Sequence, residues 1–372
     1  MPTTDPYAGI FDAAGKRVVA DGKAASYEYT FSDYASYSAK LKTSAAAVPP
    51  SVAQMLWDGN YHAMIEANLL EPLDSLLPDL PKFDAGVLEQ MKFNGKTYAV
   101  PMDVNTLSIG YNKAIFAKLG LSVPTTFDEL LALNKPLRDA GYEPLALPLK
   151  QVGFSYDTFL AMLAYTDPTD TALRQAEQGE VAWNSEPFLR AAEMVQQLQE
   201  SGLLIEGAPS LNMGGAVSVF GSQKAAMMYA VGNYLFKALD DAIDGKFEYD
   251  MFAFPPPDAG TKPRATGGPA ILWSVPTKAK DKDGAYDYLK KVTDEKSAAL
   301  MLKDSYIPAF PSDVPTDADP LFQRLLELQP GAGSRVIFDP KVFAALVDSV
   351  TQLLSGKSSA QQLVDDLQSA AA

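Results

Sequence analysis

The chain has 372 residues, 47% of them hydrophobic and 21% charged, with a formal net charge of −15 at pH 7. Because this length exceeds what a single hydrophobic core usually supports, we expect two domains in a soluble globular protein. The acidic balance argues against nucleic acid and anionic lipid as partners, since either polyanion would be repelled, and it favours a neutral or cationic small ligand.

Short strands and helices are predicted to alternate through the first part of the chain. The opening through Gly22 carries only short apolar pieces and no assignable element. Residues 27–31 alternate as a strand does, and Ser32 and Asp33 are placed to cap a helix that follows. Further on, the pattern predicts strands at 52–56 and 106–111, a helix at 61–70, and a hairpin at 94–101 with an Asn-Gly turn.

Helices dominate the second part. Thr126 and Glu129 have the spacing of a capping box and predict the start of a helix. Gly202 is placed to end a helix at 186–201, and Pro255–Pro257 predicts an exposed connection. The remaining expected elements are strands at 224–231 and 270–275 and helices at 157–164, 234–243, 283–293, 339–354 and 360–370. Strands alternating with helices predict a layered α/β fold with mainly parallel pairing.

Few residues could carry catalysis or hold a metal. Cysteine is absent and His62 is the only histidine, so thiolate catalysis and His- or Cys-rich metal sites are excluded, and we expect no metal and no cofactor. Gly214-Gly215 and Gly267-Gly268 lack the flanking pattern of a nucleotide-binding loop, and turns are the simpler interpretation. Asp58 and Asp103 could form the carboxylate pair of a glycosidase, with solvated or capping roles as the alternative.

A sugar site needs flat apolar surfaces and planar hydrogen-bonding groups, and one turn offers both. Trp57, Asp58, Asn60 and Tyr61 lie together where a strand is predicted to lead into a helix. The alternative is that Trp57 packs in the core and Asp58 caps the helix. A later loop supplies a second group of candidate contacts, Gln151, Phe154 and Tyr156, whereas Trp183 precedes a helix and is interpreted as structural.

Several segments occur in an order that identifies a family. They are ANLLEPLD at 67–74, NGKTYAVP at 94–101, YNK at 111–113, LGL at 119–121, PTTFDEL at 124–130, FGSQKAAM at 220–227 and GNY at 232–234. Together they resemble the family 1 extracellular solute-binding proteins, which are maltose-binding-protein-like sugar binders. The chain departs from that pattern at Gln223 and Tyr234, where the family usually has Gly and Trp, and it lacks an evident first strand before residue 27.

The resemblance implies an α/β, two-lobed periplasmic-binding-protein fold of type II with a ligand cleft between the lobes. The expected N-terminal lobe comprises 1–110 and 256–307, and the C-terminal lobe comprises 111–255 and 308–372. By the same resemblance, ligand-facing residues are expected at Asp103, Asn105, Asn233 and Tyr234. Trp273 lies on a predicted strand, where it faces either the ligand or the core.

The resemblance also implies a function. We expect an extracytoplasmic binding protein that captures a mono- or oligosaccharide and delivers it to the permease of an ABC importer by hinge closure. Such a protein is a monomer, is not an enzyme, and is periplasmic or anchored outside the cell as a lipoprotein, although residues 1–6 do not resemble a signal segment. The alternatives are a carbohydrate-active hydrolase that uses Asp58 or Asp103, and a sensory or scaffolding protein with the same fold.

Overall fold

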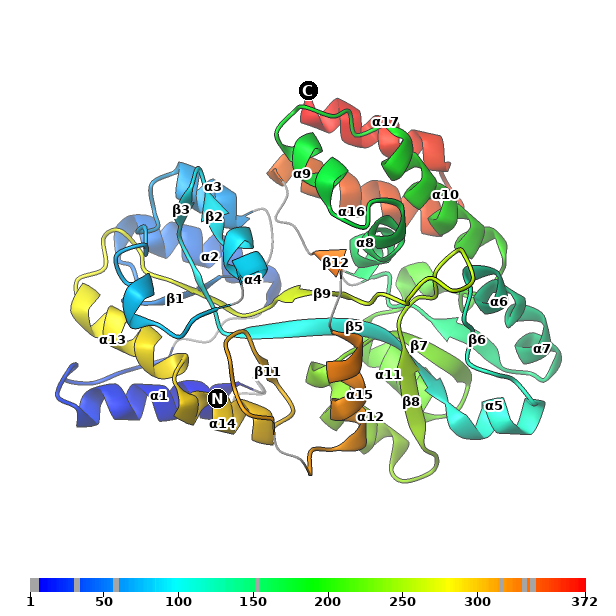
Figure 1. Ribbon diagram of the computed structural model, residues 1–372, viewed down its shortest axis with the longest axis horizontal. Coiled ribbons are helices and arrows are strands. Elements are labelled where there is room, and N and C mark those ends of the chain that lie inside the picture. Colours follow the sequence, from blue (N-terminus) through cyan, green and yellow to red (C-terminus); the bar gives the residue numbers. More distant parts are fainter. Residues whose placement is uncertain are drawn as a thin grey trace. The chain divides into compact units, whose positions relative to one another are not determined.

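The structure is a computed structural model that describes residues 7–29, 34–55, 60–83, 85–150, 154–314, 317–329, 333–334 and 339–372 (Figure 1). Contacts divide the chain into two compact units. Unit 1 comprises Met1–Asn105 and Pro269–Ala318, and unit 2 comprises Thr106–Gly268 and Asp319–Ala372. The lobe boundaries expected from the sequence, after residues 110, 255 and 307, stay a prediction, because a division by contacts does not identify the residues about which a lobe rotates.

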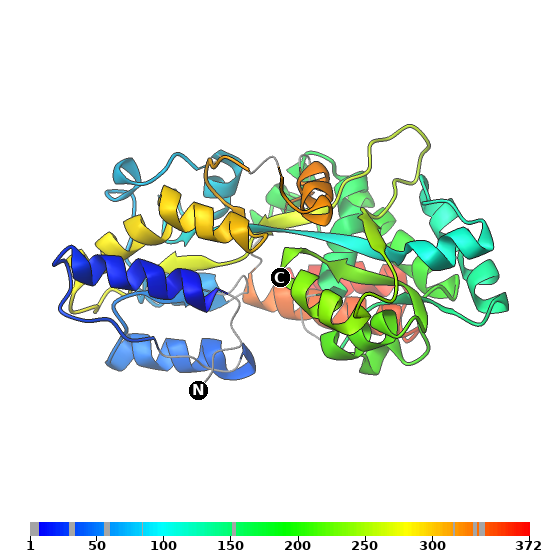
Figure 2. The same cartoon turned by 90° about the horizontal axis from the view of Figure 1, so that it is seen from below.

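Unit 1 is built around a small antiparallel sheet. Strand β10 (Leu272–Ser274) lies between β1 (Ala53–Met55) and β4 (Val100–Pro101). The other strands of the unit are β2 (Lys92–Phe93), β3 (Lys96–Thr97) and β11 (Ile307–Pro308), and its helices are α1 (Ala8–Ala20), α2 (Tyr34–Ala47), α3 (Asn60–Glu66), η1 (Leu77–Asp79), α4 (Ala85–Gln90), α13 (Lys282–Val292) and α14 (Glu295–Lys303). Figures 1 and 2 both show α1 lying along α13, with α14 following.

Unit 2 contains a larger mixed sheet. Strand β5 (Asp103–Asn112), which begins in unit 1, pairs with β7 (Ala225–Val231) and β8 (Tyr249–Phe252), and β7 pairs in turn with β6 (Glu143–Ala146). The short strand β12 (Gly333–Ser334) pairs with β9 (Thr266–Pro269).

Most of the helices of unit 2 gather into two groups. Four pack on one another to form the main apolar core: α8 (Phe154–Thr166), α10 (Glu186–Glu200), α16 (Pro340–Leu354) and α17 (Ala360–Ala371). Near β7 and β8 lie α11 (Met213–Gly221), α12 (Phe236–Ile243) and α15 (Pro320–Leu328). The remaining helices are α5 (Lys113–Leu119), α6 (Phe127–Ala132), α7 (Asn134–Asp139), α9 (Thr171–Glu177), η2 (Ala208–Ser210) and η3 (Asn233–Leu235).

Features that depend only on neighbouring residues were predicted correctly from the sequence. Asn94 and Gly95 have φ angles of 48° and 75°, and they form the tight turn between β2 and β3. Thr126 accepts a hydrogen bond from the Glu129 amide at 3.2 Å, and the Glu129 carboxylate accepts one from the Thr126 amide at 3.3 Å, so the predicted capping box is confirmed. Helix α10 ends before Gly202, whose φ angle is 71°.

The opening of the chain differs from the sequence-based expectation. The stretch with no assignable element contains α1, whose buried Ile10, Phe11, Ala14 and Val18 follow a helical period. The strand expected at 27–31 is wrong for the described residues 27–29, which are irregular. The expected caps, Ser32 and Asp33, lie outside the described residues.

The expectation of mainly parallel pairing is wrong. Among the described registers only β6 with β7 and β12 with β9 are parallel, whereas β10 and β5 run antiparallel to their partners. Most of the strands that pair are far apart in the chain, and the long path between them sets their direction. β5 pairs with β7, β8 and β11, which all follow it much later, and each of them returns antiparallel to it. The connection after β8 also differs from expectation, because Pro255 and Pro256 are buried and exposure begins at Pro257.

Candidate functional site

The clearest candidate for a ligand contact is Asn233, just beyond the end of β7. Its side chain is 3% exposed, and neither its Oδ1 nor its Nδ2 has a hydrogen-bond partner among the described residues. Buried polar groups are normally hydrogen-bonded, and an unpaired one costs about 1–3 kcal/mol. A ligand with neighbouring donor and acceptor groups would satisfy both ends of this amide.

A β-bulge sets the direction of the chain before Asn233. Strand β5 pairs Ser108 with Val231 but Ile109 with Tyr229, so Ala230 is the extra residue, and its φ angle is 67°. Bulges of this kind bend a strand and redirect the side chains that follow. The hydroxyl of Tyr234 donates a 2.7 Å hydrogen bond to the Ala230 carbonyl and closes the turn. Tyr234 is a predicted ligand contact, and its hydroxyl is used here to hold the turn together.

Gly232 allows the backbone to come close to β5. A Cβ atom at this position would lie 2.8 Å from the Thr106 carbonyl oxygen and 3.1 Å from Cε1 of Tyr234. The Thr106 hydroxyl is itself buried and has no hydrogen-bond partner within the described parts of the chain. Unit 2 thus contains two buried polar groups, the Asn233 amide and the Thr106 hydroxyl, that have no partner among the described residues, and the backbone of Thr106 comes close to Gly232, next to Asn233.

Asp103 is fully buried in unit 1, and both its carboxylate oxygens accept hydrogen bonds from the protein. The Tyr7 hydroxyl donates to Oδ2, and the Ile271 amide donates to Oδ1 at 2.7 Å. Burial raises the pKa of Asp103 to about 6, against the opposing effect of these donors. The carboxylate therefore joins α1 to the segment before β10. Asn105, two residues later, is half-buried, and its Oδ1 has no partner among the described residues.

Tyr61 and Trp273 pack in the interior of unit 1. Tyr61 is fully buried and donates a 2.9 Å hydrogen bond to the Met91 carbonyl. Trp273 is 6% exposed and lies edge-on to Phe11 and Tyr288, with ring centroids 4.9 and 5.5 Å apart. This geometry favours the core alternative for Trp273.

The other predicted contacts are divided between described and undescribed parts of the chain. Phe154 is half-buried at the first turn of α8, and Tyr156 is buried with its ring 5.1 Å from that of Phe343. Trp57, Asp58 and Gln151 lie outside the described residues, as does the side chain of Asn60, the first residue of α3. For all of these residues the role in ligand binding stays a prediction.

Sequence reasoning missed Thr106 and Ser155, whose hydroxyls are buried without a hydrogen-bond partner in the described structure. Each follows directly after a predicted contact, Asn105 or Phe154. The polar side chain at the start of the apolar strand predicted at 106–111 is the signal that could have identified Thr106, whereas Ser155 precedes the helix predicted at 157–164 and carried no such signal. The predicted structural role of Trp183 is confirmed by its burial against Phe188, with ring centroids 5.0 Å apart.

No helix among the described residues is both long and apolar enough to span a bilayer. Nor do their His, Asp and Glu side chains form a group of three or more that could hold a metal ion.

Comparison with known proteins identifies relatives over much of the chain. A multiple sugar-binding protein of Streptococcus mutans serotype c is 27% identical over 209 residues, which are 55% of this chain and 49% of the relative. A diacetylchitobiose binding protein of Streptomyces coelicolor is 23% identical over 243 residues, which are 62% of this chain and 50% of the relative. The matches thus span about half the length of each relative.

The fold is shared with solved structures. A chitin oligosaccharide binding protein superposes with a TM-score of 0.81 at 19% identity, covering 98% of this chain and 94% of the other. The predicted two-lobed α/β fold class is thereby confirmed. The family model described as bacterial extracellular solute-binding protein matches residues 23–299. The chain therefore belongs to the bacterial extracellular solute-binding protein family.

Proposed function

We propose that this protein captures a carbohydrate outside the cytoplasmic membrane and delivers it, chemically unchanged, to the permease of an ABC importer. Membership of the solute-binding family supports capture rather than catalysis. The relatives named above are themselves named for sugars, including an oligosaccharide of chitin and diacetylchitobiose. Delivery by hinge closure, a monomeric state and a periplasmic or lipid-anchored location belong to the same proposal.

The observation that carries the proposal is the pair of buried polar groups of unit 2, in Asn233 and Thr106, that have no partner among the described residues. The Asn233 amide offers a donor and an acceptor, and the Thr106 hydroxyl offers both. Sugar hydroxyls also donate and accept, so a carbohydrate is the class of ligand that would satisfy both groups. An anionic ligand fits less well, because neither group carries a charge.

The geometry of Asp103 supports binding without turnover. A catalytic carboxylate must reach the proton or carbon on which it acts. Both oxygens of Asp103 instead accept hydrogen bonds from Tyr7 and Ile271. The proposal therefore assigns this residue to the architecture of unit 1 and not to chemistry.

A thermal unfolding screen against mono- and oligosaccharides tests the proposal. A sugar present at 100 times its dissociation constant should stabilise the protein by about 2.7 kcal/mol, which is a shift of several degrees. Chromatography of the same mixtures should recover the sugar intact. Released glycosidic fragments would instead favour the hydrolase, and a panel with no shift would exclude the sugars tested and favour the sensory or scaffolding alternative.

A further inference from the structure

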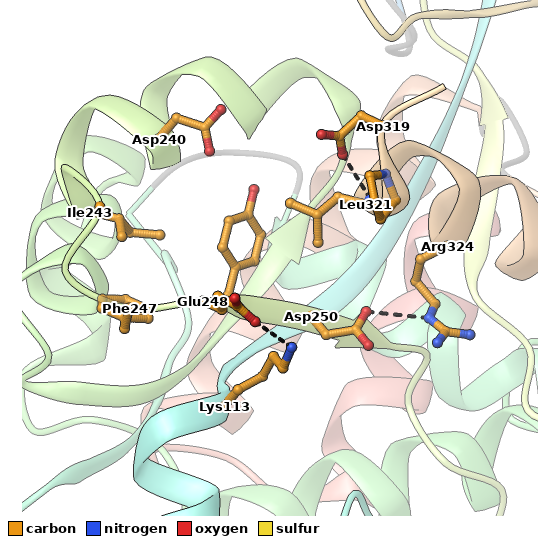
Figure 3. A pocket seen from close by; sticks show the side chains of 12 residues that line it. Lys113, Asp240, Ile243, Phe247, Glu248, Asp250, Asp319, Leu321 and Arg324 are labelled. Carbon is orange, nitrogen blue, oxygen red and sulfur yellow. Dashed lines mark hydrogen bonds and ion pairs between the residues drawn. The ribbon is translucent and has the colours of Figure 1, made fainter. Parts of the chain in front are cut away.

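Unit 2 contains a surface cavity that the proposed carbohydrate site does not use. It has a volume of about 670 Å³ and lies between the end of α12, the start of β8 and the start of α15 (Figure 3). Ile243, Phe247 and Leu321 supply apolar surface to its lining, and several charged side chains surround them. A cavity of this size accommodates a small molecule.

The lining includes a buried polar group that no described residue satisfies. Tyr249 is 7% exposed, and its hydroxyl has no hydrogen-bond partner among the residues that the structure describes. Burial first, and then the nearby carboxylates of Asp240 and Asp319, raise the pKa of this hydroxyl. The charges of two acidic groups thus act on the phenol oxygen, and its residue lines the cavity.

The charges around the cavity do not balance. Lys113 pairs with Glu248 at 2.6 Å, and Arg324 pairs with Asp250 at 3.3 Å, so both cations of the lining are already engaged.

The two remaining carboxylates, Asp240 and Asp319, have no ion pair within the described chain. One oxygen of Asp319 accepts from the Leu321 amide at 2.8 Å, which leaves the other available. Figure 3 shows the carboxylates of Asp240 and Asp319 turned toward each other across the cavity.

We propose that this cavity binds the ammonium group of a small alkylamine, held between the carboxylates of Asp240 and Asp319 with the Tyr249 hydroxyl oxygen as a third acceptor. An ammonium group has three N–H donors, which match these three acceptors. The methylene groups of the ligand would lie against Ile243, Phe247 and Leu321.

A metal ion suits the site less well. Calcium and magnesium take about six or more oxygen ligands, whereas the described residues contain no group of three or more acidic or histidine side chains placed to hold a metal ion. The alkylamine proposal does not depend on the carbohydrate function.

Isothermal titration of the purified chain without sugar tests the proposal. The probes are 1,4-diaminobutane, its neutral counterpart butane-1,4-diol, and calcium chloride. We expect one diamine to bind per chain, with an affinity that falls as salt is added, and no binding of the diol. Absence of diamine binding, equal binding of the diol, or binding of calcium alone would each overturn the proposal.

Three variants locate the binding site. Asp240→Asn removes one carboxylate and Tyr249→Phe removes only the unpartnered hydroxyl, so each should weaken diamine binding by about tenfold or more while the protein stays folded. Asp241→Asn is the matched control, because it changes the net charge equally but lies outside the lining and pairs with Lys237. If Asp240→Asn and Asp241→Asn weaken binding equally, the effect is one of overall charge and the proposed site is wrong.

Discussion

The hydroxyl of Tyr7 donates a hydrogen bond to Oδ2 of Asp103, which lies 96 positions later in the chain. The ring of Tyr7 also packs on that of Tyr306, with centroids 4.2 Å apart. Tyr306 directly precedes β11, whose Ile307 and Pro308 pair with Val104 and Asp103. The Tyr7–Asp103 contact therefore fastens the start of α1 to the place in unit 1 where β5, β11 and the segment before β10 meet.

The buried Asp103 should make stability depend on pH. Its pKa is about 6 in the folded chain against an ordinary value of 3.8, so the folded state binds the proton more tightly than the unfolded state. The associated stability is fully present below about pH 4 and is lost as the pH rises through about 6, a change of about 3 kcal/mol. Asp103→Asn should remove this dependence, which denaturant unfolding of both proteins between pH 4 and pH 7 would measure.

Tyr7→Phe should change the pH dependence of stability in the opposite direction from Asp103→Asn. The Tyr7 hydroxyl lowers the pKa of Asp103, so its removal should raise that pKa further and move the loss of stability to higher pH. If the difference in unfolding free energy between wild type and Asp103→Asn does not change with pH, the carboxylate is not held as the structure shows.

Arg17 should be a large contributor to the stability of unit 1. Its guanidinium donates to both carboxylate oxygens of Asp294 at 2.9 Å, to the Lys291 carbonyl at 2.7 Å and to the Ser297 hydroxyl at 2.9 Å. Arg17→Ala should lower the unfolding free energy by about 2–3 kcal/mol, because a partly buried, charge-assisted contact and two further hydrogen bonds are lost. Arg17→Lys should recover only part of it, since an ammonium group cannot reproduce the planar fork.

The neighbouring Lys16 is the control for Arg17. It pairs with Asp12 at 2.6 Å, but its side chain is 68% exposed, so Lys16→Ala should have little effect on thermal unfolding. Equal losses in the Lys16 and Arg17 variants would contradict the role given to Arg17.

Features set by neighbouring residues were predictable from the sequence, and features set by distant contacts were not. The Asn94–Gly95 turn and the capping box of Thr126 need only local chemistry. Helix α1 was missed although its apolar spacing is helical, because Gly15 lowers the helical propensity. That glycine is required by tertiary packing, since a Cβ atom there would lie 2.8 Å from the Tyr27 ring.

The candidate site was predictable only in part, for the same reason. Asn233 was identified through a family pattern, but its burial without partners depends on the bulge at Ala230 and on the approach of Thr106. No local motif encodes either feature. Asp103 was predicted as a ligand-facing residue or a glycosidase carboxylate, and that role stays a prediction. Its partners Tyr7 and Ile271 lie far away in sequence, so its contacts could not be anticipated.

Gly232→Ala should disturb the end of β7. The added Cβ atom would lie 2.8 Å from the Thr106 carbonyl, closer than real Cβ contacts, so the backbone must shift. We expect a loss of about 1–3 kcal/mol in unfolding free energy together with weaker sugar binding. Gly214→Ala in α11 is the control, because its nearest neighbour would be 3.8 Å away and alanine favours a helix. A Gly232→Ala protein with unchanged stability and binding would contradict the close approach.

Asn233→Ala should separate ligand binding from folding. The amide has no partner in the described protein, so its removal should leave the stability of the ligand-free chain unchanged or slightly higher. Sugar affinity should fall by about tenfold or more, because two hydrogen bonds to the ligand are lost. Asn184→Ala is the control, since that exposed amide donates to Asp365 at 3.2 Å and should leave affinity unchanged. Titration of both variants with the sugar found by the screen measures the affinity, and thermal unfolding without sugar measures the stability. If Asn233→Ala destabilises the ligand-free protein, the amide supports the fold instead.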